Sequence, residues 1–342
     1  MKIIVDAFGG DHAPLEILKG CEQAVEKLDL DILLIGREDE IRRVAHENAI
    51  SLNRMEIINT TDVIGMEDHA GEIMKSKINC SMAEGLRRLA AMEGDAFISA
   101  GNSGALVVGA TLIVKRIKGI KRIAFAPIMP KDDGCFMLID SGANVECKAD
   151  MLRQFGLMGS IYMQKVMNIQ NPRIALANIG TEEHKGGELQ HEAFELLKNS
   201  KLNFVGNIEA RDIPFDAGDV IVADGFTGNI ILKTYEGVAM MLMSKVKNIF
   251  TKSALNKLAA AIVLKDIKLL KTTMDYNEYG GAPLMGCARP VFKAHGSAKA
   301  KTFYNALRLT KAYVASGVVE EISASVADYK SQSEQSDINE EC

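Results

Sequence analysis

Four glycine-containing segments of the sequence carry polar side chains directly after short apolar runs. They are DAFGGDHAP at 6–14, SAGNSG at 99–104, DGFTGN at 224–229 and KAHGS at 293–297. Glycine lets backbone N–H groups approach an anion closely, and the N-terminus of a following helix favours negative charge. One such turn is common structural punctuation, but here four of them carry Asp, Asn, Ser, Thr or His. The sequence therefore predicts a polar crevice for a phosphate-like anion.

The candidate substrate-binding residues are the polar side chains and glycines of these four turns. They are Asp6, Gly9, Gly10, His12, Asn102, Ser103, Gly104, Asp224, Gly225, Thr227, Gly228 and His295. A histidine at such a turn donates either a proton or only a hydrogen bond. The residues alone leave both roles open for His12 and for His295.

Three further side chains have a chemical interpretation and a structural one. Lys185, in NIGTEEHKGG at 178–187, stands beside two glycines and offers a positive charge to a phosphate, or it is a solvated loop lysine. Ser103 lies in GNSGA, which lacks the last glycine of a nucleophile elbow, so the alternative is a serine that caps the next helix. For Asn229, the alternative to a site role is a plain helix N-cap.

Several standard motifs are absent from the sequence. No G-x-x-x-x-G-K-[ST] segment indicates a P-loop, and the first turn lacks the G-x-G-x-x-G of a dinucleotide site. The metalloprotease pattern H-E-x-x-H is also missing, and none of the six cysteines forms a C-x-x-C pair. We therefore expect neither a nucleotide cofactor nor a metal.

Short apolar runs alternate along the chain with longer stretches of helical pattern. The expected strands are 3–5, 32–35, 55–58, 96–99, 123–128, 136–139, 173–177, 203–205, 220–223 and 291–293. The expected helices are 14–27, 38–48, 81–92, 105–115, 149–167, 187–199, 229–250 and 298–315. This alternation predicts a layered α/β/α fold with a mainly parallel sheet, whose strands end at the four turns. We expect one unit over 1–330 and a polar, acidic, disordered tail over 331–342.

Composition excludes several classes of protein. The chain has 342 residues, of which 47% are hydrophobic, which is enough for a large core. A net charge of −5 argues against a nucleic-acid partner, and no run of uncharged apolar residues is long enough to span a membrane. The N-terminus resembles a strand and lacks the pattern of a secretory signal, so we expect a cytoplasmic protein.

One region departs from the acidic average. Residues 245–271 hold seven lysines and a single acid, with the apolar run LAAAIVL at 258–264. A basic, apolar helical segment is typical of membrane-surface or partner-docking helices, although an ordinary helix with a solvated lysine face fits equally well.

Nearly the whole chain resembles the PlsX-type phosphate acyltransferases of bacterial phospholipid synthesis. The resemblance rests on VDAFGGDHAP (5–14), SAGNSGALVVGATLIVKRIKGI (99–120), DSGANVECK (140–148), NIGTEEHKGGEL (178–189), GNIEARDIP (206–214), VADGFTGNIILKTYEG (222–237) and KAHGS (293–297). Their order and spacing also match, over roughly residues 1–330.

The resemblance implies transfer of a fatty acyl group from acyl carrier protein to inorganic phosphate, without a covalent enzyme intermediate. It also implies a fold like the isocitrate/isopropylmalate dehydrogenases and phosphotransacetylases, a homodimer and peripheral association with the membrane. With this resemblance, we assign the apolar contact with the membrane to Leu258, Ala261, Ile262, Val263 and Leu264. A membrane acyltransferase would then use the acyl phosphate to acylate glycerol 3-phosphate. In this hypothesis Lys185 neutralises phosphate charge and Asn229 hydrogen-bonds the oxyanion or the phosphate.

Two other functions compete with this one. An enzyme of the same fold, such as a phosphotransacetylase using acetyl-CoA or a decarboxylating dehydrogenase, does not need the basic, apolar segment. A non-catalytic membrane scaffold that recruits the carrier protein explains that segment but leaves the four polar turns without a purpose.

Overall fold

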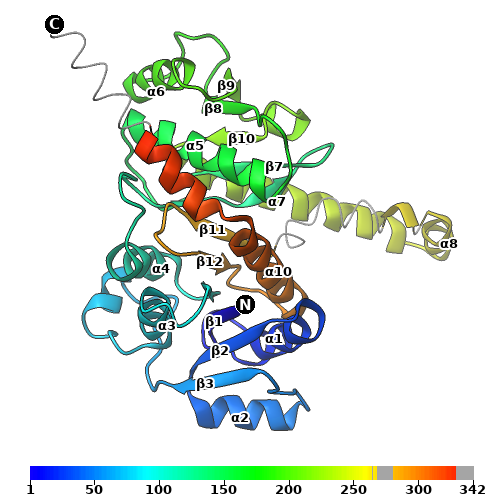
Figure 1. The fold of residues 1–342 in the computed structure, drawn as a ribbon. Helices are drawn as coiled ribbons and strands as arrows, with labels where there is room; N and C mark the ends of the chain where they lie inside the picture. Colours follow the sequence, from blue (N-terminus) through cyan, green and yellow to red (C-terminus); the bar gives the residue numbers. More distant parts are fainter. Residues whose placement is uncertain (264, 268–279, 329–342) are drawn as a thin grey trace, which may run out of the picture.

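Two mainly parallel β-sheets form the frame of the chain (Figure 1). The computed structural model describes residues 1–263, 265–267 and 280–328. The larger sheet has the order β3-β2-β1-β4-β12-β11-β5, in which only β11 runs antiparallel to its neighbours. Its strands are β1 (Lys2–Asp6), β2 (Asp31–Gly36), β3 (Met55–Asn59), β4 (Ala96–Ser99), β5 (Ala124–Phe125), β11 (Gly281–Met285) and β12 (Val291–Ala294).

The smaller sheet has the order β6-β7-β10-β8-β9, with β6 antiparallel to β7. Its strands are β6 (Ile128–Pro130), β7 (Cys135–Ile139), β8 (Ile174–Asn178), β9 (Phe204–Glu209) and β10 (Val220–Val222). The predicted strand over 123–128 is therefore two strands in two different sheets. Pro127 has no N–H to continue the ladder, and the chain changes sheets there.

The helices lie on both faces of the sheets. They are α1 (Leu15–Leu28), α2 (Glu38–Glu47), α3 (Ser81–Ala90), α4 (Ser103–Gly109, extended by a π-helical turn at Ala110–Val114), α5 (Ala149–Lys165), α6 (Glu188–Lys198), α7 (Gly225–Thr251), α8 (Ala254–Ile262) and α10 (Ala300–Ser316). Short 3₁₀ turns occupy Ala70–Met74 and Ile213–Phe215.

Strand β1 shows why continuous apolar runs become central strands. Its successive side chains point to opposite faces of the sheet, and both faces are covered. Ile3 packs in one core with Ile17 of α1 and Phe303 of α10, whereas Ile4 packs in a second core with Leu86 of α3. The predicted layered α/β class is confirmed, with its strands divided between two sheets.

The two sheets share a continuous hydrophobic core. A single cluster of buried residues includes Ile3 and Val5 of the larger sheet together with Met137 and Val220 of the smaller one. Helix α10 also contacts both β12 and α5. The prediction of one unit over 1–330 stays a prediction, as does the acidic tail over 331–342, which lies outside the described residues.

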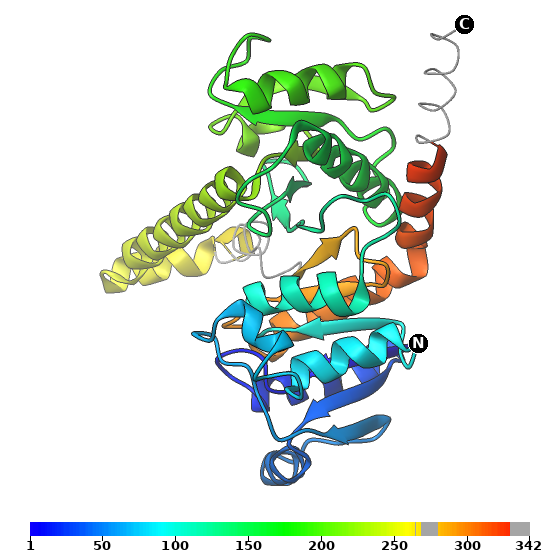
Figure 2. The ribbon, with the colours of Figure 1, turned by 90° about the vertical axis from the view of Figure 1, so that its left-hand side faces the viewer.

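Helices α7 and α8 form an arm that projects from the body (Figures 1 and 2). With 27 residues, α7 is about 40 Å long. The arm exposes large apolar side chains, among them Met240, Leu255 and Ile262. Among the helices that the structure describes, none has the length and apolar content needed to cross a bilayer.

Candidate active site

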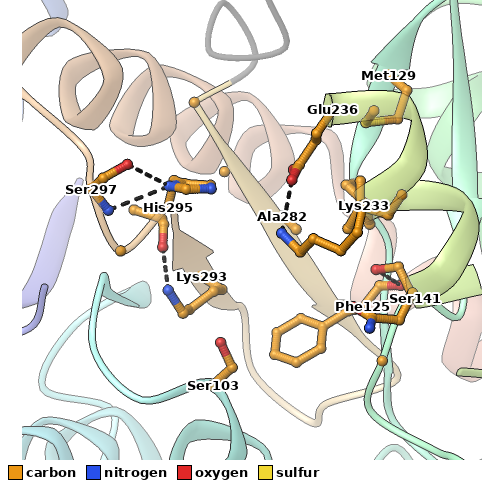
Figure 3. A pocket seen from close by; sticks show the side chains of 18 of the residues that line it. Ser103, Phe125, Met129, Ser141, Lys233, Glu236, Ala282, Lys293, His295 and Ser297 are labelled. Carbon is orange, nitrogen blue, oxygen red and sulfur yellow. Dashed lines mark hydrogen bonds and ion pairs between the residues drawn. The ribbon is translucent and has the colours of Figure 1, made fainter. Parts of the chain in front are cut away.

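A cavity of about 460 Å³ lies between the two sheets, at the carboxyl ends of their strands. Its lining combines polar and charged side chains with apolar ones, among them Phe125, Ile128 and Met129. Lys233 and Glu236 lie on the same side as Met129, and Lys293 and His295 lie on the opposite side (Figure 3). The polar and charged lining residues are Asp11, Ser103, Ser141, Asn229, Lys233, Glu236, Lys293, His295 and Ser297.

The strand order brings the four predicted turns to this cavity. Strands β1, β4 and β12 are neighbours, so the turns that follow them lie side by side; the N–H of Asp11 donates to the carbonyl of Gly296 at 2.8 Å. The turn after β10 approaches from the smaller sheet. Each turn contributes at least one lining residue: Asp11, Ser103, Asn229 and His295. That the turns bind an anion stays a prediction.

The glycines of the first turn allow it to pack against its neighbours. A Cβ on Gly9 would lie 2.6 Å from the backbone nitrogen of Gly101, and a Cβ on Gly10 would lie 2.8 Å from the carbonyl oxygen of Gly296. Gly10 also has a φ of +97°, which favours glycine. These two residues bring the turns together, which is a structural role.

Asp6 is buried beneath the cavity and does not line it. Its carboxylate accepts hydrogen bonds from the hydroxyls of Ser81 (2.6 Å) and Ser99 (2.7 Å) and from the N–H of Phe8 (3.2 Å). Burial raises the pKa of this carboxyl group above its ordinary value. The side chain therefore organises the first and second turns from below.

Asn102 also acts as a structural residue. Its Oδ1 accepts from the N–H of Ala105 at 3.0 Å and so caps α4. Its Nδ2 donates to the carbonyls of Gly65, Met66 and Asp68 at 2.9–3.1 Å. Because Asn102 is the N-cap, Ser103 is the first residue inside the helix, and the interpretation of Ser103 as the cap is wrong. Ser103 is exposed and lines the cavity, and Gly104 beside it packs near Ala70.

The third turn starts a helix four residues earlier than the sequence predicts. Asp224 caps α7, since its carboxylate accepts from the backbone N–H (2.9 Å) and the hydroxyl (2.7 Å) of Thr227. Gly225 allows close contact with Asn144, because a Cβ there would lie 2.5 Å from the carbonyl oxygen of that residue. Asn229 therefore lies in the second turn of α7 and is not an N-cap. It is exposed and lines the cavity.

The turn after β7 forms the cavity wall facing Asn229, at Ser141 and Gly142. Buried Asp140 holds this turn: its carboxylate accepts from the backbone N–H groups of Phe125 (2.9 Å), Ala143 (3.1 Å) and Asn144 (2.7 Å). Burial raises the pKa of Asp140. In the sequence, residues 140–144 directly follow a predicted strand, and this position indicates that they add to the rim of the site.

Two lysines that the sequence analysis did not select line the cavity (Figure 3). The ammonium group of Lys293 donates to the carbonyl of Ala100 at 3.1 Å, and burial lowers the pKa of this lysine to about 8. Lys233 pairs with the buried Glu236 at 2.8 Å. Lys293 is the first residue of the fourth turn, two residues before His295. This position in the turn was the signal that could have identified it.

His295 lines the cavity beside Lys293. Its Nδ1 accepts from the backbone N–H of Ser297 at 3.3 Å and lies 2.9 Å from the hydroxyl of that residue. The backbone contact makes Nδ1 an acceptor, which places the proton of a neutral ring on Nε2. Burial lowers the pKa of His295, which favours the neutral ring.

Of the predicted site residues, Ser103, Asn229 and His295 line the cavity, and His12 and Lys185 are among those that do not. His12 is exposed, and its neighbour Asp11 takes the lining position. Lys185 is half-buried in the loop after β8, where its carbonyl accepts from Nδ2 of Asn178 at 3.0 Å. Because β8 is next to β10, this loop is at the same edge of the smaller sheet as the Asn229 turn.

Sequence comparisons identify the family. A family model described as fatty acid synthesis protein matches residues 1–321. The phosphate acyltransferase of Thermoanaerobacterium thermosaccharolyticum is 44% identical over 95% of this chain and 97% of its own length. That of Listeria innocua is 46% identical over 96% and 98%. The chain belongs to the phosphate acyltransferase family. It is an acyltransferase enzyme of lipid synthesis that transfers an acyl group to phosphate, as the sequence predicted.

Solved structures support the same fold. A phosphotransacetylase from Streptococcus pyogenes matches this acyltransferase with a TM-score of 0.64 and 18% identity, covering 92% of this chain and 94% of the other. The EutD phosphotransacetylase from Staphylococcus aureus gives 0.60 and 17% over the same shares. At these identities the likeness shows the fold, and the predicted phosphotransacetylase-like architecture is confirmed.

Within the described ranges, no three His, Cys, Asp or Glu side chains are grouped so that they could hold a metal ion. The cationic groups of the cavity are instead Lys233 and Lys293.

Proposed function

We propose that the acyltransferase takes a fatty acyl group from the thioester of acyl carrier protein and gives acyl phosphate and the free carrier thiol. The observation that carries the proposal is the cavity, whose lining combines cationic and polar groups with apolar side chains. Phosphate fits beside Lys293, His295 and Ser103. The beginning of an acyl chain fits beside Phe125 and Met129.

In the proposed reaction, phosphate attacks the thioester directly. A phosphate oxygen forms a bond to the carbonyl carbon, and the carbonyl oxygen becomes the oxyanion of a tetrahedral intermediate. The C–S bond then breaks, and the sulfur leaves as a thiolate that takes up a proton. Since phosphate is already an anionic nucleophile, catalysis needs its position and the stabilisation of the oxyanion.

The cavity residues have matching roles in this proposal. Lys293 neutralises phosphate charge inside the cavity, and Lys185 adds charge from the neighbouring loop. The Asn229 amide, an uncharged donor, binds the oxyanion. Nε2 of His295 donates to the phosphate or to the leaving thiolate. Ser103 donates a hydrogen bond and forms no acyl-enzyme.

The test is the rate of acyl phosphate formation from palmitoyl-carrier protein and phosphate, trapped as the hydroxamate. We expect an Asn229→Ala protein with an unchanged melting temperature to lose roughly 100-fold in rate, the usual effect of removing one oxyanion donor. A Lys185→Ala protein should also be slower, because it loses a charge that helps to bind phosphate. Ser103→Ala should retain at least a tenth of the rate. Near-normal rates in Asn229→Ala and Lys185→Ala would remove their assignment, and abolished activity in Ser103→Ala would favour a covalent mechanism.

The same assay separates the competing enzyme. A phosphotransacetylase would form acetyl phosphate from acetyl-CoA and phosphate faster than it uses the carrier-bound palmitoyl group. We expect the opposite order for this acyltransferase.

The arm is proposed to contact the membrane, where a membrane acyltransferase consumes the acyl phosphate. Leu258, Ala261 and Ile262 are exposed on α8, and Val263 is half-buried beside them, whereas Leu264 lies outside the described residues. Exposed apolar side chains on α7 offer a separate surface for the expected homodimer; they are Val238, Met240, Met241 and Leu242.

A further inference from the structure

A second basic region lies far from the arm in the sequence, in the loop that follows α4. We call residues 115–122, KRIKGIKR, the basic loop. It holds Lys115, Arg116, Lys118, Lys121 and Arg122 and no acid, in a chain whose net charge is −5.

The cations of the basic loop are available to a partner. All five are exposed, as is Lys148 nearby. Lys121 pairs with Asp150 at 2.7 Å. The charged groups of Lys118 and Arg122 have no acidic partner among the residues that the structure describes.

The backbone of the basic loop is held in place. The side chain of Gln154, buried on α5, accepts from the N–H of Lys121 at 2.8 Å and donates to the carbonyl of Gly119 at 2.9 Å. The N–H of Ile117 donates to the carbonyl of Gly286 at 3.0 Å. The loop therefore presents its charges from a fixed frame, which lowers the entropy lost on binding.

A hollow of about 420 Å³ adjoins the basic loop. Arg116 and Arg122 line it together with one acid, Glu146, the polar Thr111 and Asn144, and apolar side chains of the α4 segment and of the turn after β7. Two of these, Leu112 and Val145, are 56% and 66% exposed. Cations around exposed apolar side chains suit a partner that is acidic and carries apolar residues.

One turn of the chain separates this hollow from the cavity between the sheets. Ser141 and Gly142 line the cavity, whereas Ala143, Asn144 and Val145 line the hollow. Nδ2 of Asn144 donates to the carbonyl of Ile123 at 2.7 Å, which ties this wall to the strand that leads to Phe125. A molecule in the hollow is therefore next to the reacting groups.

We propose that the basic loop, Lys148 and the adjoining hollow are the docking surface for the acidic carrier protein that delivers the acyl group. The inference rests on the proposed function and names the partner surface of the same cavity. The arm is the competing surface, but Thr251 at the end of α7 lies about 33 Å along the helix from Asn229. Arg122 is three residues from the cavity-lining Phe125. A carrier on the basic loop can therefore place its thioester in the cavity, and its acidic surface complements the five cations of the loop.

The test compares two double charge reversals that change net charge equally. Lys118→Glu/Arg122→Glu alters the basic loop, and Lys245→Glu/Lys252→Glu alters the arm. Each is assayed with palmitoyl-carrier protein and with palmitoyl-pantetheine, a thioester without the acidic protein. Binding of the unacylated carrier is followed by fluorescence anisotropy, and melting temperature reports on folding.

We expect the basic-loop variant to lose at least ten-fold in kcat/KM with palmitoyl-carrier protein and to keep its rate with palmitoyl-pantetheine. Its affinity for the unacylated carrier should also fall at least ten-fold. Its kcat/KM with palmitoyl-carrier protein should depend less on salt concentration than that of the wild type. The arm variant should match the wild type in solution. A loss confined to the arm variant, or wild-type carrier affinity in the basic-loop variant, overturns the docking surface. If the wild-type enzyme uses palmitoyl-pantetheine but not the carrier, the proposed donor fails, and the docking surface fails with it.

Discussion

Gly228 packs directly against the backbone carbonyl of Asp140: a Cβ on Gly228 would lie 1.9 Å from that oxygen. This contact joins the start of α7 to the turn after β7. Both sides of the contact border the cavity, at Asn229 and at Ser141. The position of Asn229 therefore depends on a neighbour without a side chain.

We predict that Gly228→Ala lowers kcat/KM by roughly 100-fold, because displacing the turn by about 1 Å misplaces the reacting groups. It should also lower the melting temperature. Gly237→Ala is the matched control on the same helix, since a Cβ at that position would have no atom within 4 Å. That control should leave activity unchanged and stabilise the protein by about 0.5–1 kcal/mol. Equal behaviour of the two variants would contradict this role of Gly228.

Asn102 is predicted to matter for stability through four hydrogen bonds. Asn102→Ala removes a helix cap and leaves buried carbonyls unpaired, so the free energy of unfolding should fall by about 3 kcal/mol. Asn102→Asp keeps the oxygen that caps α4 but loses the donors to Gly65, Met66 and Asp68, and should fall between the alanine variant and the wild type. Urea unfolding midpoints measure the order, and a fully stable Asp variant would show that the donors contribute nothing.

Lys293 gives the reaction a predicted pH dependence. Burial lowers the pKa of this lysine to about 8, so it loses its charge as the pH rises through that value. If the charge binds phosphate, the KM for phosphate should rise above pH 8 in the wild type. Lys293→Arg stays charged and should not show this rise, whereas Lys293→Ala should have a high KM at every pH. Identical pH profiles for the wild type and the arginine variant would exclude the assignment.

The arm is predicted to bind anionic vesicles through the apolar side chains of α8. Ile262→Asp/Val263→Asp should weaken binding at least ten-fold, because it removes apolar contact area and adds negative charge. Ser244→Asp/Asn248→Asp adds the same charge to α7 without removing an apolar residue and should weaken binding less. Co-sedimentation with vesicles of phosphatidylglycerol measures both. Undiminished binding of the first variant would count against contact through α8.

The sequence determined the local features of this protein. Continuous apolar runs such as 3–5 and 96–99 indicated strands buried on both faces, and glycines after them indicated the turns that border the cavity. Prediction from the sequence missed a strand whose residues are not typical of strands. Strand β11, GAPLM at 281–285, contains glycine and proline and resembles a loop, but it pairs with β12 and β5. Motif order over the whole chain identified the family, because the comparison used many positions at once.

Only the tertiary structure decided which turns meet. Strand β12 comes last in the chain yet pairs with β4, which places Lys293 and His295 beside the second turn. Strand β10 belongs to another sheet, so Asn229 faces the same cavity from the opposite side. Strand pairing is set by burial of side chains on whole sheet faces, and spacing along the chain does not encode it. For the same reason, the structure assigned Asp6 and Asn102 to support and brought Lys233 and Lys293 into the cavity.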